Sequence, residues 1–205
     1  PIRSSAASDV YKRQEYHQGN FQVKGTRVGI GIFDLCSRQS GNSISVKRKK
    51  ELTGRSWPNG CHVAEVEIDA ETGEVRLDRY VSVDDVGNTV NPMIVHGQVQ
   101  GGIASGLGQA VLERTEYDAS GQLLSGSYMD YALPRADDMP SLSGSLFEKA
   151  PCLTNPLGAK GTGEIGAVAG PPAIVHAVID ALAEKGITQV DMPLQPQKIW
   201  ECLKR

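Results

Sequence analysis

A short stretch of the sequence, residues 154–166 (TNPLGAKGTGEIG), combines one acid with four glycines. Glycine has no Cβ, so its backbone N–H can approach a ligand closely, although the residue loses more conformational entropy on folding. A carboxylate in water titrates at about pH 4.3, so Glu164 can serve as a base near neutral pH only in a pocket that partly desolvates it. Apolar Ile165, Ala167 and Val168 are candidates for the pocket walls. The stretch predicts either a catalytic carboxylate or an exposed acid that favours the dipole of a following helix.

The same glycines also fit the dinucleotide-binding pattern Gly161-x-Gly163-x-x-Gly166. That pattern requires a hydrophobic strand before the first glycine, and residues 151–160 contain two prolines and no β-branched run. It also requires an acid at the end of a strand about twenty residues later, whereas Asp180 and Glu184 lie in a segment with helical periodicity. A nicotinamide-binding protein is therefore the weaker alternative.

A second glycine-rich segment, residues 94–113 (IVHGQVQGGIASGLGQAVLE), has the length and the apolar spacing of a helix. Its five interior glycines cost roughly 4–5 kcal/mol relative to alanine, which is comparable to the whole stability of a small domain. Two kinds of compensation are open: very close packing against another helix, or a cofactor that lies against the bare backbone with Gln98 and Gln100 as polar partners. His96 is interpreted as an ordinary histidine, because no second histidine or cysteine stands at metal-ligand spacing.

Several further elements are expected to position these segments. Alternating apolar and acidic residues over 62–69, a turn at 69–73 and a return strand over 74–84 predict a β-hairpin. In the return strand, the alternation places Val75, Leu77, Val81 and Val83 on one side and Arg76, Asp78 and Tyr80 on the other. Short strands are expected at 28–33 and 126–134. Pro171-Pro172 is expected to open a helix with a buried stripe of Ile174, Val178, Ala181 and Leu182, and Gly186 is expected to end it. Ile199, Trp200 and Leu203 would anchor a last helix over 197–204.

Composition limits the class of protein. The chain has 205 residues, a net charge of −3 and 40% hydrophobic residues, which suits one globular domain or two small ones. Nothing in it suggests nucleic acid as a partner. No apolar run reaches membrane-spanning length, so the chain is expected to be cytoplasmic and without a membrane span. The four cysteines are scattered, so free buried thiols are expected rather than a zinc or iron–sulfur ligand set. The basic run at 47–50 is interpreted as a solvated turn.

The first 14 residues, PIRSSAASDVYKRQ, carry no structural period and look like a non-native, adapter-like leader. We therefore expect residues 15–205 to be the C-terminal part of a longer chain.

The order of the remaining motifs resembles one family. PNGCHVAEVEIDAETGEV, DDVGNTVNPMIVHGQVQGGIASGLGQAVLE, YMDYALPRADDMP, TNPLGAKGTGEIG and PPAIVHAVIDAL are similar, in the same order, to the C-terminal part of the molybdopterin-binding large subunit of the xanthine dehydrogenase family. That family includes aldehyde oxidoreductases, N-heterocycle hydroxylases and aerobic carbon monoxide dehydrogenase. The resemblance is best over residues 57–205 and implies an α+β fold, with helices packed on a mixed β-sheet, that forms the C-terminal lobe of a molybdenum cofactor-binding domain.

The resemblance also implies roles for individual residues. Glu164 falls on the family's active-site glutamate, the general base in a reaction that transfers water-derived oxygen to an aldehyde, an N-heterocycle or CO. Cofactor contacts are implied for seven residues of the two glycine-rich segments: Gly97, Gln98, Gly101, Gly102, Gly161, Thr162 and Gly163. Lys160 would either pair with an anionic part of the cofactor or be solvated.

The implied cofactor is a molybdenum–molybdopterin group in the cytosine dinucleotide form, in which the pterin dithiolene and no protein side chain holds the metal. Iron–sulfur clusters and FAD would lie on partners, an iron–sulfur small subunit and an FAD medium subunit, in a hetero-oligomer. The first cofactor-binding lobe and the substrate-selecting loop are not in this sequence, so the chain is not expected to be active alone. From the residues alone, a non-catalytic domain whose glycines serve tight packing remains the alternative.

Overall fold

The computed structural model describes residues 13–47, 49, 51 and 54–204. The chain divides into two compact units, Pro1–Glu51 and Leu52–Arg205. Most of the expected leader lies outside the described residues, which include only its last two positions. Of these, Gln14 pairs with Val23 in a strand, and the backbone oxygen of Arg13 accepts a hydrogen bond from the backbone N–H of Lys24.

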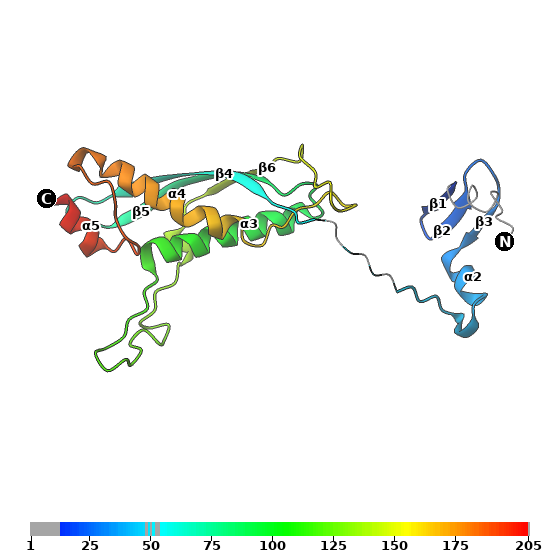
Figure 1. Cartoon of the computed structure of the whole chain (residues 1–205), viewed down its shortest axis with the longest axis horizontal. Helices are drawn as coiled ribbons and strands as arrows, with labels where there is room; N and C mark the ends of the chain where they lie inside the picture. The colour runs from blue at the N-terminus through cyan, green and yellow to red at the C-terminus, as the bar shows by residue number, and fades with distance from the viewer. Residues whose placement is uncertain (1–12, 48, 50, 52–53, 205) are drawn as a thin grey trace. The chain divides into compact units, whose positions relative to one another are not determined.

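The first unit is a small antiparallel sheet followed by a short helix (Figure 1). Its strands, in the order β1-β2-β3, are β1 (Gln14–His17), β2 (Asn20–Val23) and β3 (Gly29–Gly31). The strand expected over 28–33 ends at Gly31, because helix α2 (Ile32–Ser37) begins at the next residue. A 3₁₀ turn follows at Ser40–Asn42. Lys47 and Lys49 of the basic run are exposed, and the other two residues of the run lie outside the described residues.

The second unit contains the predicted hairpin, which the structure confirms. Strands β4 (Asn59–Ile68) and β5 (Val75–Asp85) pair antiparallel, and β6 (Leu142–Leu146) adds to β5 in parallel, so the sheet is mixed. Asp69 closes the turn, because its carboxylate accepts the backbone N–H groups of Glu71 and Thr72. These hydrogen bonds lower the pKa of Asp69.

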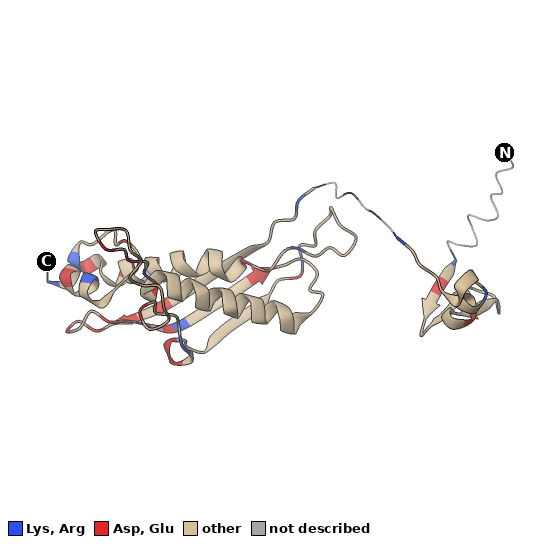
Figure 2. Ribbon diagram, turned by 90° about the horizontal axis from the view of Figure 1, so that it is seen from below, with Lys and Arg blue, Asp and Glu red and all other residues tan. Residues whose placement is uncertain are grey.

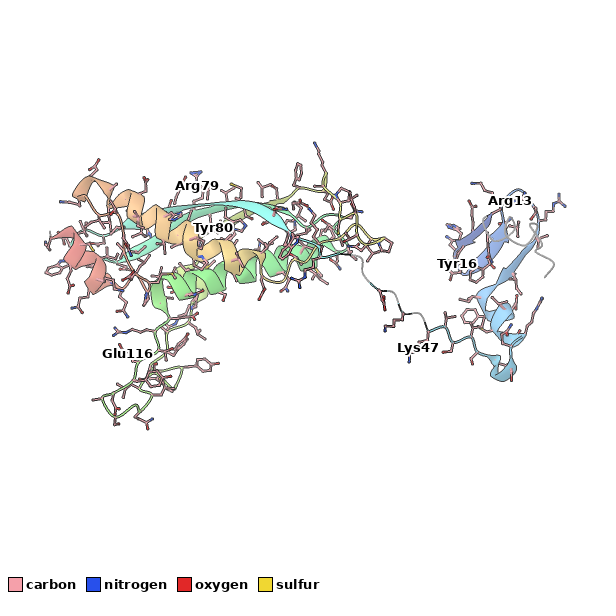
Figure 3. The ribbon with its side chains drawn as sticks, in the orientation of Figure 1. Arg13, Tyr16, Lys47, Arg79, Tyr80 and Glu116 are labelled. Atoms are coloured by element: carbon pink, nitrogen blue, oxygen red, sulfur yellow. The ribbon has the colours of Figure 1, made fainter. Side chains whose placement is uncertain are left out.

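The predicted facing of the return strand is wrong beyond Leu77, because β5 contains a bulge. Glu65 pairs with Arg79 but Val66 pairs with Leu77, so Asp78 is an extra residue. An extra residue moves every later side chain of a strand to the opposite face. Tyr80 therefore lies on the helix side and is completely buried, whereas Arg79 lies on the outer side (Figure 3). For the same reason Ser82 and Asp84 are buried, and Val81 and Val83 are exposed.

Two helices pack side by side and cover one face of this sheet (Figure 1). They are α3 (Pro92–Leu107), which continues into a π-helical turn at Gly108–Leu112, and α4 (Ile165–Ala181). Asn91 caps α3 by accepting the backbone N–H of Ile94. Figure 2 shows this helix pair almost free of charged residues. The core between the helices and the sheet includes Leu77, Tyr80, Val99, Ile103, Leu107, Ile174, Val178 and Leu182.

Helix α4 begins earlier than predicted. Pro171 and Pro172 lie inside it rather than at its start, because the preceding turns are held by packing against α3, which outweighs the local preference of proline for a first turn. Ile174, Val178 and Leu182 are buried as expected, but Ala181 is exposed. A 3₁₀ turn at Ala183–Lys185 follows, and Gly186 ends it in the left-handed conformation.

Other expectations for the second unit are mixed. The last helix, α5 (Pro196–Leu203), is anchored by Ile199 and Cys202, whereas Trp200 is 40% exposed. No strand forms over 126–134, where the chain runs irregularly after α3 and a 3₁₀ turn follows at Ala136–Asp138. Within the described part of the chain, no helix is both long and apolar enough to cross a membrane.

Candidate functional site

The predicted catalytic stretch borders a cavity of about 650 Å³ in the second unit. This volume is in the range of small-molecule and cofactor sites. The start of β4, the end of β5, the glycine loop and the first turns of α4 all contribute to its walls. The lining residues are Ser56, Trp57, Pro58, Asn59, Gly60, His62, Asp84, Gly161, Gly163, Glu164, Ile165, Val168 and Ala169. The cavity is therefore mostly apolar, with a small set of acidic and imidazole groups.

Glu164 stands at the N-cap position of α4 and is exposed on the cavity wall. Its side chain caps no backbone N–H, so its carboxylate is available to the cavity. Gly161 and Gly163 have no atom within 4 Å of the point where a Cβ would stand, which leaves their backbone open. The hydroxyl of Thr162 is buried and has no hydrogen-bond partner among the described residues. Gly161 and Gly163 thus present open backbone on the cavity wall beside one carboxylate, whereas Thr162 is not part of the cavity lining.

Lys160 was expected either to pair with the cofactor or to be solvated, but in the structure it pairs with Asp85. Its Nζ lies 2.5 Å from Oδ2 of Asp85, and both side chains are largely buried. Burial by itself raises the pKa of Asp85, but the hydrogen bonds from Lys160 and from the backbone N–H of Gly87 outweigh it and leave the pKa below its ordinary value. The backbone N–H of Lys160 also donates to the carbonyl of Val86. This pair therefore fixes the glycine loop to the end of β5.

The glycines of α3 fall into two groups, which match the two explanations offered for them: close helix packing and exposed backbone for a cofactor. Gly102 and Gly106 face α4 so closely that a Cβ would stand 2.7 Å from the backbone nitrogen of Ala167 and 2.8 Å from Cδ of Pro171, respectively. Gly97 and Gly101 have nothing within 4 Å of that point, and Gln98 between them is exposed. Close helix packing accounts for the first pair. The second pair forms a bare exposed strip on α3.

The two sets of predicted cofactor residues meet at the same helix contact without sharing the large cavity. A Cβ on Gly166 would stand 2.3 Å from the carbonyl oxygen of Val99, so the turn after Glu164 packs against the turn that carries Gln98. The cavity lining includes Gly161 and Gly163 but neither Gly97 nor Gln98. The walls of the large cavity are formed by the glycine loop, α4, the start of β4 and the end of β5, and the start of α3 is not part of them.

Sequence reasoning missed a buried hydrogen-bonded group of three side chains, two of which, His62 and Asp84, line the same cavity as Glu164. Nε2 of His62 lies 2.9 Å from Oδ1 of Asp84, and Nδ1 of His62 lies 2.9 Å from the hydroxyl of Tyr80. Burial, followed by the charge of Asp84, raises the pKa of Tyr80, so the phenol keeps its proton and can donate it to Nδ1. In that tautomer Nε2 carries the hydrogen that Asp84 accepts. Tyr80 and Asp84 lie 18 and 22 residues from His62, with the β5 bulge in between, so no local sequence pattern could reveal the group.

The other candidate ligands take no part in this site. All four cysteines are free, and Cys202 alone is buried. A hydrogen bond with Thr154 lowers the pKa of the Cys152 thiol, which lies on the same loop as Lys160. Among the described residues, no group of three or more His, Cys, Asp or Glu side chains is arranged to hold a metal ion.

Comparisons with known proteins agree on one family. Residues 4–140 match the family model of the molybdopterin cofactor-binding domain. The chain is 32% identical over 197 residues to the gamma subunit of the 6-hydroxypseudooxynicotine dehydrogenase complex of Paenarthrobacter nicotinovorans, a match that covers 91% of this chain and 24% of the relative. It is 34% identical over 215 residues to the carbon monoxide dehydrogenase large chain of Afipia carboxidovorans, covering 98% of this chain and 26% of the relative.

Solved structures give the same result. Quinoline 2-oxidoreductase from Pseudomonas putida 86 superimposes with a TM-score of 0.84 at 32% identity, over 95% of this chain and 26% of that one. The chain therefore spans about a quarter of the length of the relatives it matches. The family model ends before the Glu164 loop, whereas the carbon monoxide dehydrogenase match covers nearly the whole chain.

Proposed function

Because this chain belongs to the molybdopterin cofactor-binding domain family, we propose that it forms part of the large subunit of a molybdenum hydroxylase and carries the general base of that enzyme, Glu164. The observation that supports this role most directly is the position of Glu164, a carboxylate without a capping partner on the wall of a 650 Å³ cavity. A positioned base of this kind contributes on the order of 10²–10⁴ in rate.

The residues present fit a bound pterin. Open backbone at Gly161 and Gly163 on the cavity wall is the kind of group that a polar heterocycle engages, and Thr162 between them is proposed to contribute its backbone. Gly97, Gln98 and Gly101 offer a second exposed polar strip on α3. Gly102 contributes indirectly, because the lack of a Cβ lets α4 pack closely against α3, and this packing positions the Glu164 turn. When bound, a molybdenum–molybdopterin group, proposed in its cytosine dinucleotide form, supplies the two-electron oxidation and the water-derived oxygen.

This chain's own contribution is then placement and proton transfer. The Lys160–Asp85 pair holds the glycine loop, and the packing of α4 on α3 fixes the turn that carries Glu164. The carboxylate of Glu164 acts as the general base. It accepts the proton of the hydroxyl group whose oxygen is transferred to the substrate. The apolar wall formed by Pro58, Ile165 and Val168 reduces the access of water to that carboxylate once the cavity is filled.

The proposed substrate is an aldehyde, an N-heterocycle or CO, and the proposed partners are an iron–sulfur small subunit and an FAD medium subunit. The names of the relatives support CO and an N-heterocycle as substrate classes and an assembly of several subunits, without naming the cofactors of the partner subunits. These relatives include a carbon monoxide dehydrogenase large chain, a quinoline oxidoreductase and a subunit of a dehydrogenase complex.

The test is the variant Glu164→Gln in the full-length assembled enzyme. The amide keeps the shape of the side chain but is not basic, so we expect turnover to fall by about 10²-fold or more with molybdenum content unchanged. Glu184→Gln, in the exposed turn after α4, is the matched control and should keep full turnover. Turnover retained by Glu164→Gln would remove the catalytic assignment.

A further inference from the structure

Asp84 forms part of the walls of two separate cavities. On one side it borders the large cavity that contains Glu164. On the other it borders a small cavity of about 10 Å³ between α3 and the sheet, together with Ser82, His96, Gln100 and the β6 residues. The Asp84 residue is only 1% exposed. The hydrogen bond from His62 offsets the cost of burying this carboxylate, and the carboxylate lies between the two cavities.

The small cavity has the size and the polar lining of a site for one water molecule. Its volume is about that of a single water probe. Ser82 is 2% exposed, and its hydroxyl has no hydrogen-bond partner among the described residues. A Cβ on Gly144 would stand 3.4 Å from this hydroxyl and 3.9 Å from Nδ1 of His96, so the glycine leaves the space between them free. A buried water needs two to four polar partners, and Ser82, His96 and Asp84 are such partners.

The carboxylate of Asp84 is held in one orientation. Oδ1 accepts from Nε2 of His62, which is fixed in turn by Tyr80. Gly60 makes room for it, because a Cβ there would stand 2.7 Å from Oδ1. The titratable groups around Asp84 are His62 of β4, Tyr80 of β5, His96 of α3 and, across the large cavity, Glu164 at the start of α4.

We propose that Asp84 passes protons between the cavity of Glu164 and a water molecule held by Ser82 and His96. This inference rests on the proposed function, in which Glu164 gains a proton at each turnover. After the product leaves and water re-enters the large cavity, that proton moves to one oxygen of Asp84, and a proton leaves Asp84 to the internal water. His96, which is half-buried on α3, then transfers it to solvent. Only O–H and N–H bonds form and break, and no electron moves.

The water site is tested by urea unfolding of this chain alone. The presence or absence of the water determines whether Ser82→Ala lowers or raises the unfolding midpoint. If a water bridges Ser82, the variant Ser82→Ala removes one of its partners, and the urea midpoint of unfolding falls. If no water is present, the same variant removes an unsatisfied buried hydroxyl, and the midpoint rises. Trp57 and Trp200, both in the second unit, report the transition by fluorescence. A midpoint that rises or does not move overturns the water site.

Proton transfer is tested with Asp84→Asn in the full-length assembled enzyme. The amide oxygen still accepts from His62, but an amide can neither take up nor release a proton under these conditions. We expect turnover to fall about tenfold or more, to recover with a small diffusible base such as imidazole, and to show a larger solvent isotope effect. The matched control is Asp78→Asn, on the exposed bulge of the same strand, which should behave as the wild type.

The outcomes separate the two proposals. Turnover of Asp84→Asn equal to the control, a loss that imidazole does not rescue, or a loss of bound molybdenum overturns the role of Asp84. If Glu164→Gln retains turnover, the proposed function fails instead, and the Ser82→Ala measurement still decides the water site.

Discussion

At the scale of single residues, the ionised form of Asp85 is what holds the Glu164 loop in place. Asp85 accepts hydrogen bonds from Lys160 in the loop and from the backbone N–H of Gly87, where the chain leaves β5. A neutral carboxyl would lose the charge on which the bond with Lys160 depends. The stability of the loop is therefore linked to pH through this one group.

The direction of the linkage follows from the lowered pKa. The folded-state pKa of Asp85 lies below the ordinary value of 3.8, so its contribution is fully present above that value and is lost as the pH falls below it. We expect the unfolding free energy of the wild type to exceed that of Asp85→Asn by a constant amount from about pH 7 to about pH 5, and the difference to shrink towards about pH 2. Urea unfolding across this range measures it. A difference that grows on acidification would contradict the linkage.

At the scale of elements, the close contact between α3 and α4 explains why both helices are rich in glycine. A Cβ on Gly166 would stand 2.3 Å from the carbonyl oxygen of Val99 and 2.7 Å from the backbone nitrogen of Ile103. These are backbone atoms, so no side-chain rotation can relieve the clash. Gly101, on the same helix pair, has open space at the corresponding point.

Alanine at these two positions should therefore have opposite effects on the chain alone. Gly166→Ala forces the helices apart and should destabilise the second unit by about 1–3 kcal/mol. Gly101→Ala restores helix propensity without a clash and should stabilise it by about 0.8–1 kcal/mol. Thermal or urea unfolding gives both values. In the assembled enzyme, Gly101→Ala should also lower molybdenum content, because the methyl group would cover the exposed strip. Unchanged content would separate Gly101 from the cofactor.

The sequence allowed the prediction of the elements that depend on local patterns. The hairpin, the helix over 94–113 and the Glu164 loop all carry their signals within about twenty residues. Strand β6 was missed because LSGSL has too few apolar residues to show an alternation, and it forms only because β5 lies beside it. The start of α4 was misplaced because packing against α3 overrides the usual position of proline.

The site was predictable only in part for the same reason. Glycine density made Glu164 and its neighbours candidates, and their role stays a prediction. The partners of Asp84 and Lys160 lie 22 and 75 residues away in the chain, respectively, so no spacing rule connects them. The fold alone brings these pairs together.

At the scale of the whole molecule, the chain consists of two units, and the described residues between the 3₁₀ turn at Ser40–Asn42 and strand β4 form neither helix nor strand. Lys47 and Lys49 are exposed there, and both tryptophans lie in the second unit. Brief trypsin treatment should therefore cut first in this segment and release the second unit intact. We expect mass spectrometry of the early digest to show a fragment that starts within or just after this segment and contains both tryptophans. An earlier cut inside the second unit would contradict this expectation.

The bulge at Asp78 lets both halves of β5 keep one face towards the helices although the sequence does not alternate regularly across it. Leu77 and Arg79 pair with the adjacent residues Val66 and Glu65 of β4, so Asp78 alone has no partner in the ladder. Deleting Asp78 would therefore leave a regular ladder in which Tyr80, Ser82 and Asp84 still face the helices and the valines still face outwards. A related chain without the extra residue should carry the same order of polar and apolar side chains after this point.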